Sequence, residues 1–305
     1  MFKSNYTIQK ILYTFKFKKF NELIHIFGKY PNLSIIDYGG FQSRNMSTIK
    51  LIKQALFNHK EDSSLLNINI YIFTGDNAEK AEYYRKILNI PFIFAYSTTE
   101  IYKKTVIPIP DFIFDSWIES GIFSYEDTIS KCIKNSKSPY IDNHCFWIGN
   151  PNTHPTRNIL LNISKNFPNY ISANSMQWLS SEKGKMQKTS KFITLYDHAK
   201  YKYLIDIQGC GYSGRLKILF WLKRPIFIVK RKHQEFYFSK LKEWNNFIPI
   251  KEDLSDLISK YKYIENNPEL YNSLVISGEK LAKKYLTKNY ALEYLYKVIK
   301  NYTIK

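Results

Sequence analysis

Short apolar runs rich in β-branched and aromatic residues alternate with amphipathic stretches from about Asn32 onward. Runs such as LSIIDYGG and INIYIFTGD predict strands, because they are brief, apolar and followed by glycine or aspartate. Asp76 with Glu79 three residues later indicates the start of a helix. The first half is predicted to contain strands at 33–40, 68–76, 91–97 and 111–114, and helices at 44–60, 78–88 and 124–134.

The same alternation continues in the second half of the chain. Pro155 stands where a first helical turn tolerates proline. The chain is predicted to end in three helices from about Asp253. Before them, strands are predicted at 145–149, 201–209, 225–229 and 247–250, and helices at 156–165 and 214–223.

Strands that alternate with helices of ten or more residues indicate right-handed crossovers and parallel sheets. Seven or more strands in 305 residues suit two doubly wound sheets better than one. The pattern therefore predicts an α/β protein with two Rossmann-like domains and a helical C-terminus. The boundary is expected near Asn143, after the loop SKSPYIDN, which gives domains at 1–143 and 144–305.

The chain is strongly basic, with 45 Lys and Arg against 26 Asp and Glu and a formal net charge of +19. Such a charge attracts nucleic acid, an anionic membrane surface or a phosphorylated small molecule. The lysines are dispersed and no basic tail or arginine-rich block occurs. Aromatic residues make up 17% of the whole chain, so the aromatic and basic stretch FYFSKLKEW indicates core packing rather than nucleic-acid stacking.

The cysteines and the N-terminal segment bear on the compartment. Cys132, Cys145 and Cys210 show neither disulfide-framework nor zinc-ligand spacing. The first residues, MFKSNYTIQKILYTFKFKK, are interrupted by lysines and lack the apolar core of a signal peptide. No apolar run approaches the roughly 20 residues of a membrane span. We expect a cytoplasmic protein, attached peripherally to the inner membrane surface through its charge.

In doubly wound folds, ligands bind beyond the carboxyl ends of the strands. The segment KYLIDIQGCGYSGRLKILF places small residues, including Gly211, Ser213 and Gly214, between a strand and a helix. Such a turn lets the backbone approach a phosphate, and Arg215 could bind a diphosphate through two hydrogen bonds. Asp206 could accept from ligand hydroxyls or hold the loop in place. The alternative is a structural glycine-rich connection with a surface arginine.

The stretch from Tyr201 to Leu257 resembles the signature of glycosyltransferase family 90. Four blocks carry the resemblance in order: YKYLIDIQG, YSGRLKILF, EFYFSKLKEW and FIPIKEDLSDL. The family includes capsule-associated proteins, Rumi-type protein O-glucosyltransferases and bacterial lipopolysaccharide-modifying enzymes. The resemblance implies a GT-B fold, donor diphosphate contacts from Ser213 and Arg215, and a role for Glu235 in holding the donor ribose or sugar. A solvated carboxylate at a strand end is the alternative for Glu235.

The loop FWIGNPNTHPTRNIL is similar to a family block that precedes a helix, with Gly149 and Arg157 at matching positions. The first arginine of that block is absent, because Ile148 stands in its place. Arg157 falls in a first helical turn, where the helix dipole disfavours a cation unless an anion binds nearby.

The loop PIPDFIFDSWIESG is the expected location of the catalytic base. In the eukaryotic relatives a catalytic aspartate follows a Pro-Asp segment, and Asp115 matches it best. Asp111 is the alternative, and both could instead cap turns. If neither serves as the base, Glu119 and Glu126 are the next candidates.

Together these features predict a glycosyltransferase that moves a sugar, from a UDP-sugar by family analogy, to a surface glycan such as lipopolysaccharide. The expected mechanism is a single inverting displacement, with one base deprotonating the acceptor hydroxyl. Neither a cofactor nor a metal is expected, because no Asp-x-Asp motif is present. The competing hypothesis is a non-catalytic nucleotide-sugar or nucleic-acid binding protein on the same fold.

Overall fold

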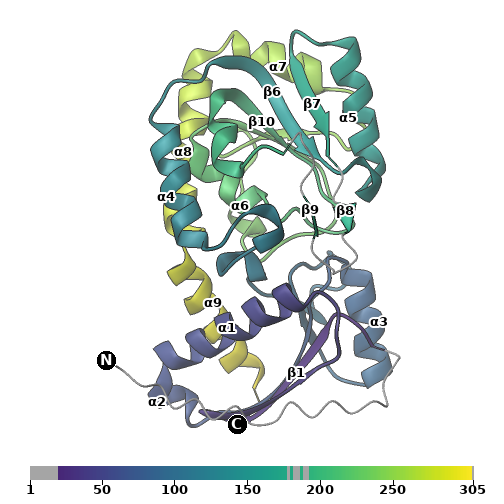
Figure 1. Ribbon diagram of the computed structural model, residues 1–305, viewed down its shortest axis with the longest axis vertical. Coiled ribbons are helices and arrows are strands. Elements are labelled where there is room, and N and C mark those ends of the chain that lie inside the picture. The colour runs from purple at the N-terminus through teal and green to yellow at the C-terminus, as the bar shows by residue number, and fades with distance from the viewer. Residues whose placement is uncertain (1–19, 177–178, 181–185, 188–191, 304–305) are drawn as a thin grey trace.

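A computed structural model describes residues 20–176, 179–180, 186–187 and 192–303. Two five-stranded sheets lie one above the other along the long axis of the molecule, each with helices packed against it (Figure 1). The expected α/β class with two Rossmann-like halves is confirmed. The first sheet ends with Pro108 and the second begins with Asp142, so the predicted boundary at Asn143 falls within the first strand of the second sheet.

The N-terminal sheet is mixed, which corrects the expectation of a purely parallel one. Its strands, in spatial order, are β2 (Asn32–Asp37), β1 (Leu23–Lys29), β3 (Asn67–Phe73), β4 (Ile93–Ala95) and β5 (Val106–Pro108). The strand β1 was not predicted, and it pairs antiparallel with both neighbours. Lys29 pairs with Asn32, so only two residues join β1 to β2. A connection this short can only form an antiparallel hairpin.

The N-terminal helices are α1 (Gln42–Asn58), α2 (Lys60–Ser63) and α3 (Ala78–Leu88). The cap of α3 is Asn77, whose side chain accepts from the backbone N–H of Lys80, and not Asp76 as predicted. The run 111–114 is also not a strand. It forms a 3₁₀ helix, Phe112–Phe114, capped by Asp111 and wholly buried. A short run in which every residue is apolar has no periodicity that could distinguish a strand from a helical turn.

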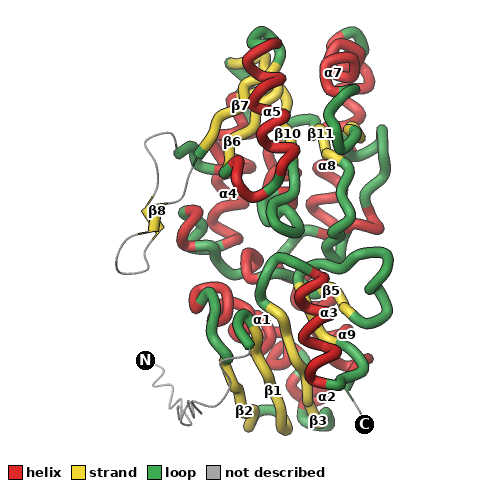
Figure 2. Tube along the Cα trace, turned by 90° about the vertical axis from the view of Figure 1, so that its right-hand side faces the viewer, coloured by secondary structure: helices red, strands yellow, loops and turns green. Residues whose placement is uncertain are grey.

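The C-terminal sheet is entirely parallel, as expected. Its spatial order is β12 (Ile248–Ile250), β11 (Ile226–Val229), β10 (Tyr201–Asp206), β6 (Asp142–Gly149) and β7 (Ile171–Ser175). The edge strand β7 was not predicted, because half-buried polar residues interrupt its sequence, ISANS. A separate two-stranded sheet joins β8 (Leu179–Ser180) to β9 (Met186–Gln187) (Figure 1). Figure 2 shows β8 standing apart from the strands of the C-terminal sheet.

The remaining helices are α4 (Tyr125–Ser136), α5 (Pro155–Asn166), α6 (Leu216–Leu219), α7 (Leu257–Glu265), α8 (Pro268–Tyr285) and α9 (Lys288–Tyr302). The helix predicted at 214–223 is therefore shorter than expected, and it continues as a 3₁₀ turn at Phe220–Leu222. The three C-terminal helices are confirmed. None of the helices in the described part of the chain is long and apolar enough to cross a membrane.

The last helix returns to the N-terminal half. Figure 1 shows α9 running from the level of the C-terminal sheet down past α1. The hydroxyl of Tyr296 donates to Asp62 at 2.9 Å, and His59 lies 2.8 Å from the carboxylate of Glu293. The two halves are thus joined by a packed helix as well as by the chain between the sheets.

Candidate functional site

A cavity of about 390 Å³ lies between the two halves, and both contribute to its wall. The C-terminal half contributes residues that follow β6 and β10, at the carboxyl ends of the parallel strands, where doubly wound sheets bind ligands. The N-terminal half contributes the start of α1 and the loop after β5. Five of the residues predicted from the sequence line this cavity: Gly149, Arg157, Ser213, Gly214 and Arg215.

Two arginines form the most basic part of the cavity wall. Arg157 donates to the carbonyl oxygens of Asn150 and Gln208, both at 2.9 Å, and Arg215 donates to that of Ile148 at 2.5 Å. Both guanidinium groups lie over the ring of Trp147, at 5.4 and 5.8 Å from its centroid.

Burial makes these two cations unfavourable without an anion. It lowers the pKa of Arg157 to about 9, and the neighbouring charge of Arg215 acts in the same direction. Burial also lowers the pKa of Arg215. An anion in the cavity would offset both effects and would accept from the guanidinium groups. Ile148, at the position of the missing arginine, supplies a backbone carbonyl that orients Arg215.

The three predicted glycines have different roles. A Cβ on Gly149 would lie 2.9 Å from Nη2 of Arg215 and 2.8 Å from the ring of Trp147, so this glycine makes room for the arginine. A Cβ on Gly211 would lie 1.6 Å from the backbone oxygen of Asp76. One on Gly214 would lie 2.5 Å from Cδ1 of Ile113. Gly211 and Gly214 therefore allow the loop to approach the N-terminal half.

Asp206 lies beneath the cavity and does not line it. Its carboxylate accepts from the hydroxyl of Ser213 at 2.6 Å and forms a buried ion pair with Arg231. Of the two roles considered for Asp206, this geometry supports holding the loop in place. Because the hydroxyl hydrogen of Ser213 is directed to Asp206, the oxygen of Ser213 is left as an acceptor toward the cavity.

Glu235 is fully buried, not solvated, and it also lies outside the cavity wall. Its Oε1 accepts from the hydroxyl of Tyr237 at 2.8 Å and lies 3.7 Å from Nζ of Lys217. Burial raises the pKa of this carboxyl group to about 7, against the opposing effect of Lys217. Glu235 is therefore not placed to contact a sugar nucleotide in the cavity directly.

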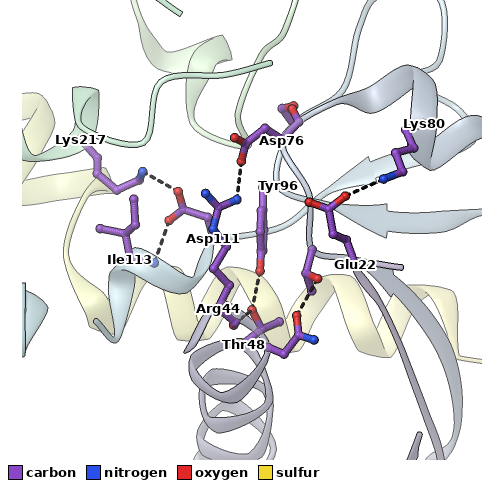
Figure 3. Close-up of polar contacts among 12 residues, drawn as sticks. Glu22, Arg44, Thr48, Asp76, Lys80, Tyr96, Asp111, Ile113 and Lys217 are labelled. Carbon is purple, nitrogen blue, oxygen red and sulfur yellow. Dashed lines mark hydrogen bonds and ion pairs between the residues drawn. The ribbon is translucent and has the colours of Figure 1, made fainter. Parts of the chain in front are cut away.

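Neither aspartate of the predicted catalytic loop lines the cavity. Asp111 accepts from Nζ of Lys217 at 2.8 Å and from the backbone N–H of Ile113 at 3.3 Å (Figure 3). Asp115 is buried on another side of the same loop, with Nζ of Lys50 at 2.7 Å and that of Lys288 at 3.5 Å. Each carboxylate is therefore neutralised by lysine and separated from the cavity.

Two other carboxylates do reach the cavity, those of Glu119 and Asp76. Oε1 of Glu119 accepts from the hydroxyl of Ser43 at 2.5 Å, and its Oε2 is buried with no hydrogen-bond partner among the described residues. Asp76 is paired with Arg44 at 2.7 Å (Figure 3). Glu119 was a reserve candidate in the sequence. Asp76 was assigned to a helix start, and nothing in the sequence signalled its pairing with Arg44.

Across the described ranges, no cluster of three or more His, Cys, Asp or Glu side chains gathers in a way that could hold a metal ion. The charged side chains that line the cavity are those of Arg44, Arg157, Arg215, Asp76 and Glu119.

Comparison with known proteins places this geometry in a family context. The sequence model described as Glycosyl transferase family 90 matches residues 37–304. Protein O-glucosyltransferase 1 of Rattus norvegicus is 31% identical over 137 residues, which cover 44% of this chain and 35% of the rat protein. Protein O-glucosyltransferase 3 of Homo sapiens is 26% identical over 144 residues, 47% of this chain and 28% of the human protein. The matches thus span about a third of the length of these relatives.

Among solved structures, the pneumococcal O-GlcNAc transferase GtfA in complex with UDP and GlcNAc is similar with a TM-score of 0.35 and 14% identity. That similarity covers 72% of this chain and 47% of the GtfA chain.

Proposed function

The chain belongs to glycosyl transferase family 90, and we propose that it transfers a sugar from a nucleotide-sugar donor to a hydroxyl group of a glycan acceptor. The observation that carries the proposal is the pair Arg157 and Arg215, two buried cations that line one cavity and donate to backbone carbonyl oxygens. A nucleoside diphosphate supplies an anion, and both guanidinium groups can donate to its oxygens.

The donor is proposed to be a UDP-sugar, with its diphosphate at Arg157 and Arg215. The oxygen of Ser213 is available to a hydroxyl of the ligand, since its hydrogen is directed to Asp206. The arginines stabilise the charge that develops on the leaving diphosphate, so no metal ion is required for this step.

Glu119 is proposed as the base. It is the carboxylate on the cavity wall with an unpartnered oxygen in the described part of the chain, whereas Asp76 is held by Arg44. The acceptor hydroxyl gives its proton to Glu119 as its oxygen bonds to the anomeric carbon. The bond from that carbon to the diphosphate oxygen breaks, and the diphosphate leaves with the electron pair. Attack from the opposite face inverts the anomeric configuration.

The acceptor is proposed to be a surface glycan such as lipopolysaccharide, reached at the inner face of a membrane. The net charge of +19 supports docking on anionic lipid. The names of the relatives, which are protein O-glucosyltransferases, favour a second acceptor class, a hydroxyl group of a protein.

The deciding experiment is a thermal-shift screen of nucleoside diphosphates and nucleotide sugars, followed by turnover on the best donor with and without EDTA. We expect a UDP-sugar to stabilise the protein and to be consumed, with water or an added glycan as acceptor, at a rate that EDTA does not change. Stabilisation by a nucleotide sugar with no consumption of it on any acceptor would favour a non-catalytic binding protein. Stabilisation by DNA alone would contradict the proposal.

A further inference from the structure

One side chain on the cavity wall has an unused hydrogen-bonding atom that the transfer reaction does not require. His198 lies in the 3₁₀ segment Leu195–Lys200, just before β10, and is 2% exposed. Its Nδ1 lies 2.8 Å from the backbone oxygen of Thr194. Because a carbonyl oxygen can only accept, Nδ1 must carry a hydrogen. Within the described residues Nε2 is buried and has no partner.

The protonation state of His198 follows from its surroundings. Burial lowers the pKa of His198 to about 3, and the positive charge of Arg215 acts in the same direction. Its ring packs edge-on against Phe146, with ring centroids 4.9 Å apart. The imidazole is therefore neutral at physiological pH, with hydrogen on Nδ1 and a bare lone pair on Nε2. A buried acceptor left without a donor is unfavourable, so a ligand that supplies an N–H or O–H gains from filling it.

The cavity that His198 lines also has apolar side chains in its wall. Ile148, Met176, Phe192, Ile193 and Leu195 line the same cavity as His198. A flat ring buries well against such side chains, whereas a ribose or a hexose would lose the hydration of its hydroxyls there. The combination of apolar walls and one acceptor matches the edge of a nucleobase.

We propose that Nε2 of His198 accepts a hydrogen bond from the ring N3–H of uracil, and that this contact makes the cavity prefer uridine nucleotides. The inference rests on the proposed function, since it takes the cavity to be the donor site. Cytosine carries a lone pair on N3, which would face the lone pair of Nε2. A uracil methylated at N3 keeps its shape and stacking but has lost the donor.

The test is calorimetric binding of UDP, CDP and 3-methyl-UDP to the wild type and to two variants. His198→Asn can keep the bond to Thr194 but ends short of the position of Nε2. His198→Gln can place a carbonyl oxygen near that position. His144→Asn is the matched control, because His144 lies near the start of β6, away from the cavity, and pairs with Asp142. The melting temperature of each variant shows whether it is folded.

We expect the wild type and His144→Asn to bind UDP about 5- to 100-fold more tightly than 3-methyl-UDP, the range for leaving one buried group unpaired. His198→Asn should lose this discrimination and His198→Gln should keep part of it. Equal binding of UDP and 3-methyl-UDP by the wild type overturns the inference, even if neither variant folds. So does discrimination that persists unchanged in folded His198→Asn.

The test must also distinguish a contact of Nε2 of His198 with uracil from a contact with the ribose. If 2′-deoxy-UDP binds weakly and His198→Asn removes that difference instead, Nε2 contacts the ribose and the base assignment is wrong. If UDP binding depends on Arg215 but UDP and 3-methyl-UDP bind equally, the inference about His198 is rejected and the proposed function stands. Failure of every nucleoside diphosphate to bind rejects the proposed function together with it.

Discussion

Nζ of Lys217, from α6, lies 2.8 Å from the carboxylate of Asp111, from the N-terminal half, and the two side chains are 1% and 2% exposed. The pair therefore joins the two halves through a charge interaction that water does not reach (Figure 3). Removing one partner of such a pair leaves an uncompensated buried charge, which is more costly than losing the attraction alone.

We predict that Lys217→Met lowers the free energy of unfolding by about 3–5 kcal/mol. Lys217→Met with Asp111→Asn should recover part of the loss, because no bare carboxylate remains at that position while Asn can still cap Phe112–Phe114. Urea denaturation of the three proteins measures this. Lys131→Met, which removes an exposed pair with Asp127, is the control and should change little. A double variant as unstable as Lys217→Met would show that the charge of Asp111 is not the source of the loss.

Arg215→Ala should weaken UDP binding by about 1.5–3 kcal/mol, the contribution of a hydrogen bond to a charged group. The fold should persist, because Arg215 donates to one backbone carbonyl, that of Ile148. Calorimetry gives the affinity. Arg85→Ala is the matched control, since Arg85 pairs with Glu82 within α3 and does not line the cavity. Unchanged UDP affinity in folded Arg215→Ala would remove Arg215 from the donor site.

Two carboxylates of one loop, those of Glu119 and Asp115, compete for the role of catalytic base. Glu119→Gln keeps the shape of the side chain and removes its basicity, so turnover should fall about 10²–10⁴-fold while UDP affinity is retained. Asp115→Asn should affect turnover far less, because Asp115 faces Lys50, Lys288 and Ser47 instead of the cavity. Steady-state turnover beside calorimetric affinity decides between them. A collapse in Asp115→Asn with near-normal activity in Glu119→Gln returns the base to Asp115.

Glu235 predicts a dependence of stability on pH. Burial raises the pKa of Glu235 from 4.5 to about 7. Between these values the folded state keeps a proton that the unfolded state has released, so the free energy of unfolding falls as the pH rises through this window. Glu235→Gln should lack this contribution, on the order of 3 kcal/mol for the shift. Urea denaturation at several pH values measures the difference, and parallel pH profiles for the two proteins would contradict it.

The net charge predicts which membranes the protein binds. If it serves docking, binding to liposomes should require anionic lipid and should weaken steeply as salt screens the charges. Co-sedimentation with anionic and neutral vesicles at two salt concentrations measures this. Equal binding to both kinds of vesicle would mean that the lysines reflect composition only.

Several parts of the fold followed from the pattern along the chain. The all-parallel C-terminal sheet was predictable, since β6 and β10 are apolar runs that are each followed by a helix. The antiparallel β1 was missed although its run LIHIF is followed by Gly28 and Pro31, and the edge strand β7 was missed because polar residues interrupt its sequence. The 3₁₀ helix Phe112–Phe114 was misassigned because its three residues are all apolar.

For the site, the sequence by itself indicated the loop after β10 and Arg215, because a glycine turn between strand and helix places its neighbours at a known edge of the sheet. Arg157 was indicated by the resemblance of its loop to a family block. Only the tertiary structure decided which carboxylates face the cavity. Asp111 pairs with a lysine of α6, and Asp115 pairs with lysines of α1 and α9. Glu119 instead accepts a hydrogen bond from Ser43 of α1. Such pairings join residues 65 to 173 positions apart. Burial and partner choice at that separation depend on how the two halves pack, which no local pattern specifies.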